Sequence, residues 1–235
     1  MAAPHISRFT LEFFRVIVRM WFALHFESVL AFDTEPFREH AESSPLIVYG
    51  NHSSWWDPMI AVLLAEKLMP GRNHYAPMDE SSLAQNAILS RIGIFGVDIH
   101  SARGAKQFHQ RSLAVLSDGG VLWITPQGRF ADVRERPLGF KPGLASISAR
   151  WPAGCTLIPL ATEYTFWNNR RPNALAHFGK AIQVEGNEDK SSLNLRLEIA
   201  LEEAMSELRA MSLTRDASSF TRLPLWRSTL RAPRG

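Results

Sequence analysis

Two histidine–aspartate pairs with identical spacing are the first candidates for chemistry in this 235-residue sequence. His52 precedes Asp57 by five residues, and His74 precedes Asp79 by the same interval. A neutral imidazole can take the proton of an attacking hydroxyl group, and such a base accelerates reactions roughly 10² to 10⁴ times. A carboxylate on the second ring nitrogen would fix the tautomer. No apolar strand is predicted before His74, so we place that pair in a polar connection at the surface or behind the site.

The sequence around the first pair favours a catalytic role. An apolar strand is predicted at 46–49, and Pro58 can open the helix that is predicted at 58–68. Side chains at such a strand-to-helix junction lie at the carboxyl edge of the sheet, where ligands of α/β proteins usually bind. We therefore predict that His52 is the general base and that Asp57 orients it.

Two glycine-containing segments could bind a substrate. The segment 125–130 (Thr-Pro-Gln-Gly-Arg-Phe) follows a predicted strand, and the segment 140–143 reads Phe-Lys-Pro-Gly. Glycine allows a ligand to approach the backbone, and the side chains of Arg129 and Lys141 offer positive charge to phosphate groups. Both segments would also serve as ordinary turns. The candidate binding residues here are Gln127, Gly128, Arg129, Lys141 and Gly143.

Other kinds of site are disfavoured. The sequence has no Gly-x-Ser-x-Gly elbow of a serine esterase, and Ser53 is interpreted as a turn residue. Its eight histidines show neither His-x-His nor His-Glu-x-x-His clustering, so no metal ion or other cofactor is expected. The single cysteine, Cys155, lies in an apolar stretch and is expected to be buried and unreactive.

Short apolar runs alternate with longer amphipathic segments, which is typical of a layered α/β domain. We predict a single domain with a mixed, mostly parallel sheet flanked by helices. The predicted strands are 46–49, 94–97, 121–124, 156–163 and 174–178, and the predicted helices are 58–68, 81–90, 102–116, 143–150 and 191–211.

Residues 1–30 are predicted to form an amphipathic helix at a membrane interface. Arg8, Glu12, Arg15 and Arg19 recur at helical spacing and interrupt an otherwise apolar stretch, so it fits neither a signal peptide nor a spanning helix. We expect these arginines to face lipid headgroups, which implies a peripheral protein on the cytoplasmic face of a membrane. A helix packed on the core is the alternative.

The net charge of +3 is concentrated in the basic tail predicted at 212–235. Five arginines and one aspartate lie there, so the rest of the chain is close to neutral. No nucleic-acid partner is therefore expected. The tail is interpreted either as flexible or as a second membrane contact.

Five blocks in order resemble the glycerolipid acyltransferase family, also described as PlsC-like lysophospholipid acyltransferases. That family carries Asn-His-x-x-x-x-Asp, a Gly-x-Phe-x-x-Asp-Arg-like block, Pro-Glu-Gly-Thr-Arg, Phe-Lys-x-Gly and a proline-containing apolar strand. The matching blocks here are Asn51-His52 with Asp57, Gly93 to Asp98, Pro126-Gln127-Gly128, Phe140 to Gly143, and Leu157 to Leu160.

The resemblance implies an acyltransferase domain at 31–211. Such an enzyme moves a fatty acyl group from acyl-CoA or acyl-carrier protein, as a cosubstrate, to the hydroxyl of a lipid acceptor, typically a lysophospholipid or lysophosphatidic acid. It also implies that His52 is the base, that Asp57 orients it, and that the Pro126-Gln127-Gly128 loop and nearby basic residues hold the acceptor phosphate. Membrane lipids and the acyl donor are the expected partners.

Three departures concern the acceptor. Gln127 stands in place of Glu, Arg129-Phe130 stands in place of Thr-Arg, and Ile99 follows Asp98 where Arg is frequent. Arg129 or Arg103 could supply the missing positive charge. The alternatives are acylation of a lipid without phosphate, such as a lipid alcohol, a lipid glycoside or an amino-acid lipid, and a non-catalytic lipid-binding or membrane scaffold protein.

Overall fold

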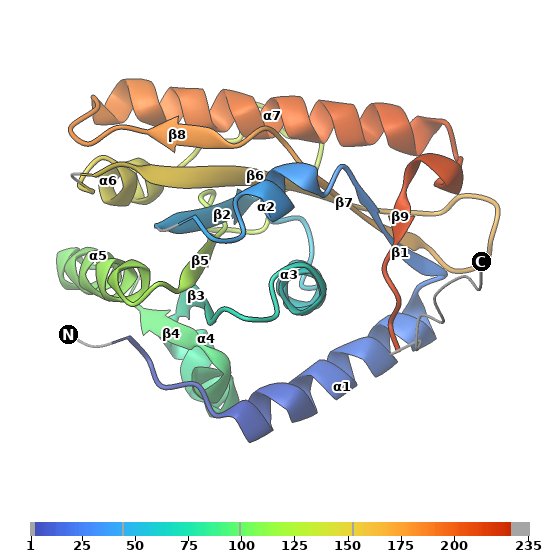
Figure 1. Ribbon diagram of the computed structural model, residues 1–235, viewed down its shortest axis with the longest axis horizontal. Coiled ribbons are helices and arrows are strands. Elements are labelled where there is room, and N and C mark those ends of the chain that lie inside the picture. The colour runs from blue at the N-terminus through green and yellow to red at the C-terminus, as the bar shows by residue number, and fades with distance from the viewer. Residues whose placement is uncertain (1–2, 44, 99, 152, 227–235) are drawn as a thin grey trace, which may run out of the picture.

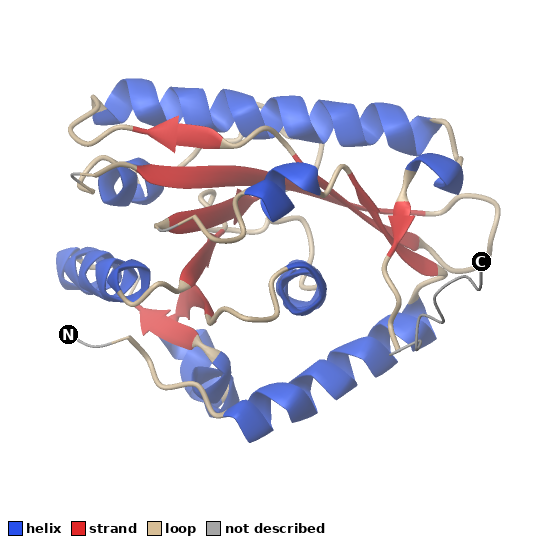
Figure 2. Ribbon diagram, in the orientation of Figure 1, coloured by secondary structure: helices blue, strands red, loops and turns tan. Residues whose placement is uncertain are grey.

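The computed structural model describes residues 3–43, 45–98, 100–151 and 153–226. Nine strands in these residues form one sheet with the order β4-β3-β5-β2-β6-β7-β1-β9, and β8 also pairs with β6 (Figures 1 and 2). Three pairings, β1 with β9 and β6 with β7 and β8, are antiparallel, and the others are parallel. This confirms the predicted single α/β domain with a mixed, mostly parallel sheet. The strands are β1 (Ser28–Phe32), β2 (Leu46–Gly50), β3 (His74–Asp79), β4 (Ile94–Val97), β5 (Val121–Ile124), β6 (Cys155–Thr165), β7 (Asn173–Phe178), β8 (Ile182–Val184) and β9 (Thr221–Arg222).

Helices cover both faces of the sheet because its central strands are apolar on both sides. In β2, Ile47 and Tyr49 pack with α5, α6 and α7, whereas Leu46 and Val48 pack with α1, α2 and α3. Figure 1 shows α7 along one face and α3 and α1 on the other. The helices are α1 (Arg8–His25), α2 (Glu35–Glu39), α3 (Asp57–Leu68), α4 (Glu80–Gln85), η1 (Ala87–Ile92), α5 (Ala102–Ser117), α6 (Gly143–Ser148), α7 (Lys190–Leu213) and η2 (Ala217–Ser219).

Two of the three arginines of the N-terminal helix α1 point in a different direction from the one predicted. The side chains of Arg15 and Arg19 are only 12% exposed, and Arg19 Nη1 lies 2.5 Å from Glu66 Oε1 on α3. The opposite side of the helix exposes a row of large apolar residues: Phe9, Phe13, Val16, Met20 and Leu24. The expectation that these arginines face headgroups is therefore wrong for Arg15 and Arg19, and the ion pair with Glu66 holds Arg19 inward.

Two predicted boundaries differ in the structure. The helix expected within 1–30 ends at His25, and Ser28–Phe32 is a strand that pairs with β7. At the other end, α7 runs to Leu213, η2 and β9 follow it, and β9 pairs with β1, so the first part of the segment 212–235 lies in helix and strand. Residues 227–235 lie outside the described residues. No helix among the described residues combines the length and apolar character needed to cross a bilayer.

The segment that contains His74 and Asp79 is also different from its prediction. It forms β3, which pairs with β4 and β5, so the assignment as a polar connection is wrong. Its polar ends and Pro77 hide the strand pattern in the sequence. The predicted helix at 81–90 divides into α4 and η1.

Candidate active site

The candidate site lies where β2 and β5 end at the same edge of the sheet. These strands are parallel and adjacent, so the segments that follow them lie side by side. At the end of β2, a Cβ atom on Gly50 would stand 2.7 Å from the backbone oxygen of Leu160. Only glycine allows the chain to pass this close to β6 before it turns into α3.

His52 and Asp57 form a hydrogen-bonded pair at this edge. His52 Nδ1 lies 3.0 Å from Asp57 Oδ2, and the side chains are 21% and 5% exposed. The backbone N–H of Ser54 donates to the same carboxylate oxygen at 2.8 Å. Asp57 is also the first residue of α3, where the helix dipole favours a negative charge. With Nδ1 donating to the carboxylate, Nε2 is left as the basic nitrogen.

The second carboxylate oxygen of Asp57 binds two hydroxyl groups of β6, which the sequence did not single out. Thr162 Oγ1 donates to Asp57 Oδ1 at 3.0 Å, and the Tyr164 hydroxyl donates at 2.7 Å. The amide of Asn51 bonds to the backbone N–H and C=O of Thr162 at 2.8 and 3.0 Å. The turn before α3 is therefore attached to β6 at several points.

A cavity of about 1120 Å³ opens beside His52 and Asp57. It runs beneath α1 and along β3 and β4, and it reaches α5 and the segment 141–146. Much of its wall is apolar, including Phe14, Val62, Leu89, Ile92, Ile94 and Phe108. Such a cavity can receive an apolar chain while presenting the imidazole to a reacting group.

Gln127 is buried beside the cavity, and its side-chain partners among the described residues are backbone groups. Its Oε1 accepts from the N–H of His52 at 3.2 Å, and its Nε2 donates to the carbonyl of Leu138 at 3.3 Å. The residue is 3% exposed and does not line the cavity. The structure therefore places Gln127 as a brace between two loops, which differs from the predicted contact with substrate.

The next residues of the loop do face the cavity. Gly128 has a φ of +62°, and a Cβ atom there would stand 2.8 Å from Lys141 Nζ, so the lysine lies directly over the loop. Arg129 Nη1 donates to Glu135 Oε2 at 3.1 Å, which partly neutralises its charge. The Phe130 ring lies 4.2 Å from the His52 ring and is 59% exposed.

The remaining predicted residues divide between the cavity and the surface. Gly143 lines the cavity, where a Cβ atom would stand 3.0 Å from the Phe108 ring. Arg103 is exposed on α5 and does not line the cavity. Ile99 lies outside the described residues.

The second histidine–aspartate pair is not a pair in space. His74 Nδ1 accepts from Trp123 Nε1, so His74 Nε2 carries the proton and donates to Met69 O, each at 3.0 Å. Burial lowers the pKa of His74 from 6.5 to about 4, so the ring is neutral. Asp79 accepts instead from the N–H groups of Ser81 and Ser82 and caps the N-terminus of α4.

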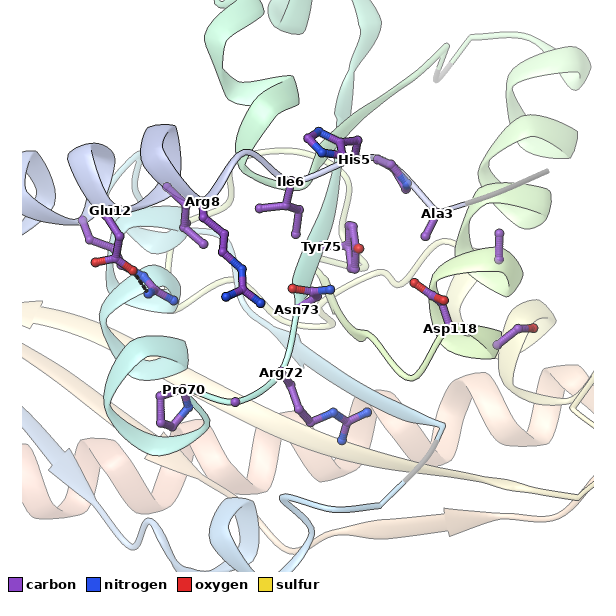
Figure 3. Close-up of a pocket in the computed structure, with 16 residues that line it drawn as sticks. Ala3, His5, Ile6, Arg8, Glu12, Pro70, Arg72, Asn73, Tyr75 and Asp118 are labelled. Carbon is purple, nitrogen blue, oxygen red and sulfur yellow. Dashed lines mark hydrogen bonds and ion pairs between the residues drawn. The ribbon is translucent and has the colours of Figure 1, made fainter.

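A second cavity of about 970 Å³ lies by the N-terminal end of α1 (Figure 3). Arg8 projects toward it from α1, and Asp118 projects toward it from the end of α5. Arg72 in its wall donates to the carbonyls of Ala41, Ser43 and Gly119. The cavity contains neither His52 nor Asp57, so we assign the chemistry to the first cavity.

Comparisons with known proteins concern the family and the fold of this chain. The sequence model of the family described as "Acyltransferase" matches residues 33–163, more than half of the chain. The fold is similar to the crystal structure of the 1-acyl-sn-glycerophosphate acyltransferase PlsC from Thermotoga maritima, with a TM-score of 0.60 and 12% identity over 85% of this chain and 80% of that one. At this identity the likeness concerns the fold. A comparison with curated protein sequences finds no match.

Proposed function

The chain belongs to the acyltransferase family, and we propose that it moves a fatty acyl group from acyl-CoA or acyl-carrier protein to the hydroxyl of a lipid. The hydrogen bond between His52 and Asp57 at the wall of an apolar cavity is the observation that carries the proposal. A complete pair of this kind favours an enzyme over a non-catalytic scaffold.

The proposed reaction needs only one base. His52 Nε2 takes the proton of the acceptor hydroxyl while its oxygen attacks the thioester carbonyl. The tetrahedral intermediate then collapses, the carbon–sulfur bond breaks, and the thiolate receives the proton from the imidazolium. Asp57 holds Nδ1 protonated and stabilises the imidazolium between these steps.

The first acceptor that we propose is a lysophospholipid or lysophosphatidic acid. Lys141 supports this choice because it lies over Gly128 and lines the cavity, where an ammonium group can bind a phosphate. Gly128, Gly143 and Arg129 would form the rest of that wall. The apolar part of the cavity beneath α1 suits the fatty chain.

A lipid acceptor without phosphate is the second candidate, and two contacts favour it. The guanidinium of Arg129 is bound by Glu135, and Phe130 covers one side of the His52 ring. Near the imidazole the loop thus presents an aromatic ring in place of a free cation. Such a ring suits the apolar face of a lipid alcohol or a glycoside.

We also propose that α1 lies in the interface of the cytoplasmic face of a membrane. Its row from Phe9 to Leu24 exposes large apolar side chains, of which Phe9 is 85% exposed. An exposed apolar stripe on a helix supports interfacial binding. The cavity beneath the same helix would then open close to the lipids that contain its substrates.

Lipid analysis by mass spectrometry tests the proposal. Cells that express the wild type are compared with cells that express His52→Ala or the control His100→Ala, which removes an exposed imidazole. We expect acylated products with the wild type and the control but not with His52→Ala. Identical lipid profiles for all three proteins would overturn the proposed function.

A further inference from the structure

We propose that Tyr164, together with Thr162, is a positioning residue for acyl transfer. The two hydroxyls hold the carboxylate of Asp57 in the orientation that keeps His52 productive. This inference rests on the proposed function, because it concerns the same histidine and the same reaction.

The carboxylate of Asp57 needs these hydroxyls because it is buried. Its side chain is 5% exposed, and a carboxylate taken out of water costs free energy unless hydrogen-bond donors surround it. One oxygen is bound by His52 and by the N–H of Ser54. The other is bound only by side chains of β6 among the described residues.

Tyr164 is the stronger and more specific of the two donors. Its hydroxyl lies 2.7 Å from Asp57 Oδ1, which is typical of a hydrogen bond to a charged acceptor. The hydroxyl of Thr162 lies 3.0 Å from Asp57 but also 3.3 Å from Asn51 Oδ1, so it has a second acceptor. Burial, and next the charge of Asp57, raise the pKa of Tyr164, so its hydroxyl remains a donor at all working pH values.

The length of β6 places both hydroxyls beside Asp57. The pairing of β2 with β6 ends at Gly50 and Leu160, and β6 continues beyond it to Thr165. Thr162 and Tyr164 are two residues apart on this extension, so their side chains lie on the same face of the strand. The ring of Phe26 packs 5.7 Å from the Tyr164 ring and restricts its movement.

Tyr164 does not line the cavity, so it acts through Asp57 rather than by touching substrate. Without the hydroxyl of Tyr164, Thr162 is the one donor to Asp57 Oδ1 that remains among the described residues, and Thr162 can turn to Asn51. The carboxylate can then rotate away from Nδ1, and the fraction of His52 with Nε2 as a free base falls. This mechanism lowers kcat and leaves KM almost unchanged.

Tyr164→Phe tests the proposal, and Tyr49→Phe is its matched control. The hydroxyl of Tyr49 is also buried and donates to the carbonyl of Leu197 at 3.1 Å, away from the site. We expect Tyr164→Phe to lower kcat about 10- to 50-fold, with KM within about twofold, as for a lost hydrogen bond to a charged group. Tyr49→Phe should lower the melting temperature to a similar degree and keep kcat.

A double-mutant cycle separates positioning from a general effect on the fold. In an Asp57→Asn background, Tyr164→Phe should change the residual rate by less than about twofold. If Tyr164→Phe proves unstable, Thr162→Val and Thr162→Ser replace it, with loss of kcat in the first and recovery in the second.

Two outcomes overturn the proposal while the proposed function stands. One is a kcat of Tyr164→Phe equal to that of Tyr49→Phe. The other is the same fold-loss with and without the Asp57 carboxylate. Turnover that does not depend on His52 would instead remove the proposed function itself.

Discussion

The ring of Phe130 lies 4.2 Å from the ring of His52, at an interplanar angle of 33°. A neutral aromatic side chain thus occupies the position beside the imidazole from which a cation could bind an acceptor phosphate. We expect Phe130→Arg to raise the preference for lysophosphatidic acid over monoacylglycerol, measured as the ratio of kcat/KM values, by about tenfold. One ion pair of roughly 1.4 kcal/mol is enough for that change.

Phe130→Leu is the control for this exchange, because it removes the aromatic ring without adding charge. It should leave the ratio within about threefold of the wild type. If the ratio of kcat/KM values is the same for the arginine and leucine variants, position 130 does not contribute to the choice of acceptor.

Gln127→Glu should lower stability rather than change the acceptor. A carboxylate at this buried position can accept from the N–H of His52, but it cannot donate to the carbonyl of Leu138. We expect a loss of about 1–3 kcal/mol in the free energy of unfolding, measured by urea denaturation. Gln110→Glu, at an exposed position of α5, should stay within about 0.5 kcal/mol of the wild type. Equal stability of the two variants would contradict the role of Gln127 as a brace.

Phe9→Ser combined with Phe13→Ser should release the protein from anionic liposomes. These side chains are 85% and 60% exposed on α1. They would bury apolar area only when the protein is bound to a membrane, so their replacement should weaken that binding. The binding constant should fall at least about tenfold, measured by cosedimentation. Leu195→Ser with Ile199→Ser removes comparable exposed side chains from α7 and should not affect binding. A similar loss in both double variants would contradict attachment through α1.

His74 should make the protein less stable as the pH falls. The pKa of His74 is lowered by burial from 6.5 to about 4 in the folded protein, so the unfolded chain binds the proton more readily. Stability from the neutral ring is therefore complete above pH 6.5 and is lost as the pH falls toward 4, with a limiting slope of about 1.4 kcal/mol per pH unit. His74→Gln should flatten this decline in urea denaturation, and His100→Gln should not. An unchanged decline in the first variant would contradict the assignment.

The sequence is enough to predict the layered fold, five of the nine strands among the described residues (β2, β4, β5, β6 and β7) and the pairing of His52 with Asp57. Apolar runs and the strand-to-helix junction fix these features locally. The hydrogen bond from Tyr164 to Asp57 could not be predicted in this way, because it depends on how far β6 extends past β2. The strand β3 was hidden by its own polar residues, and the inward turn of Arg19 depends on Glu66, which lies on another helix.

Gln127 shows a similar limit at the candidate site. Its place in the Pro126-Gln127-Gly128 loop suggested contact with an acceptor. Burial and two backbone partners give it a structural role that only the folded chain reveals.

Release of free thiol from acyl-CoA by the purified protein, with a mixture of lyso-lipid acceptors, tests the central claim most directly. We predict that the wild type and His100→Ala release thiol at the same rate, and that His52→Ala is slower by about 10² to 10⁴ times. The same measurement with acyl-carrier protein covers the second donor. If no acceptor supports thiol release from either donor, or if His52→Ala releases it as fast as the wild type, the account is contradicted.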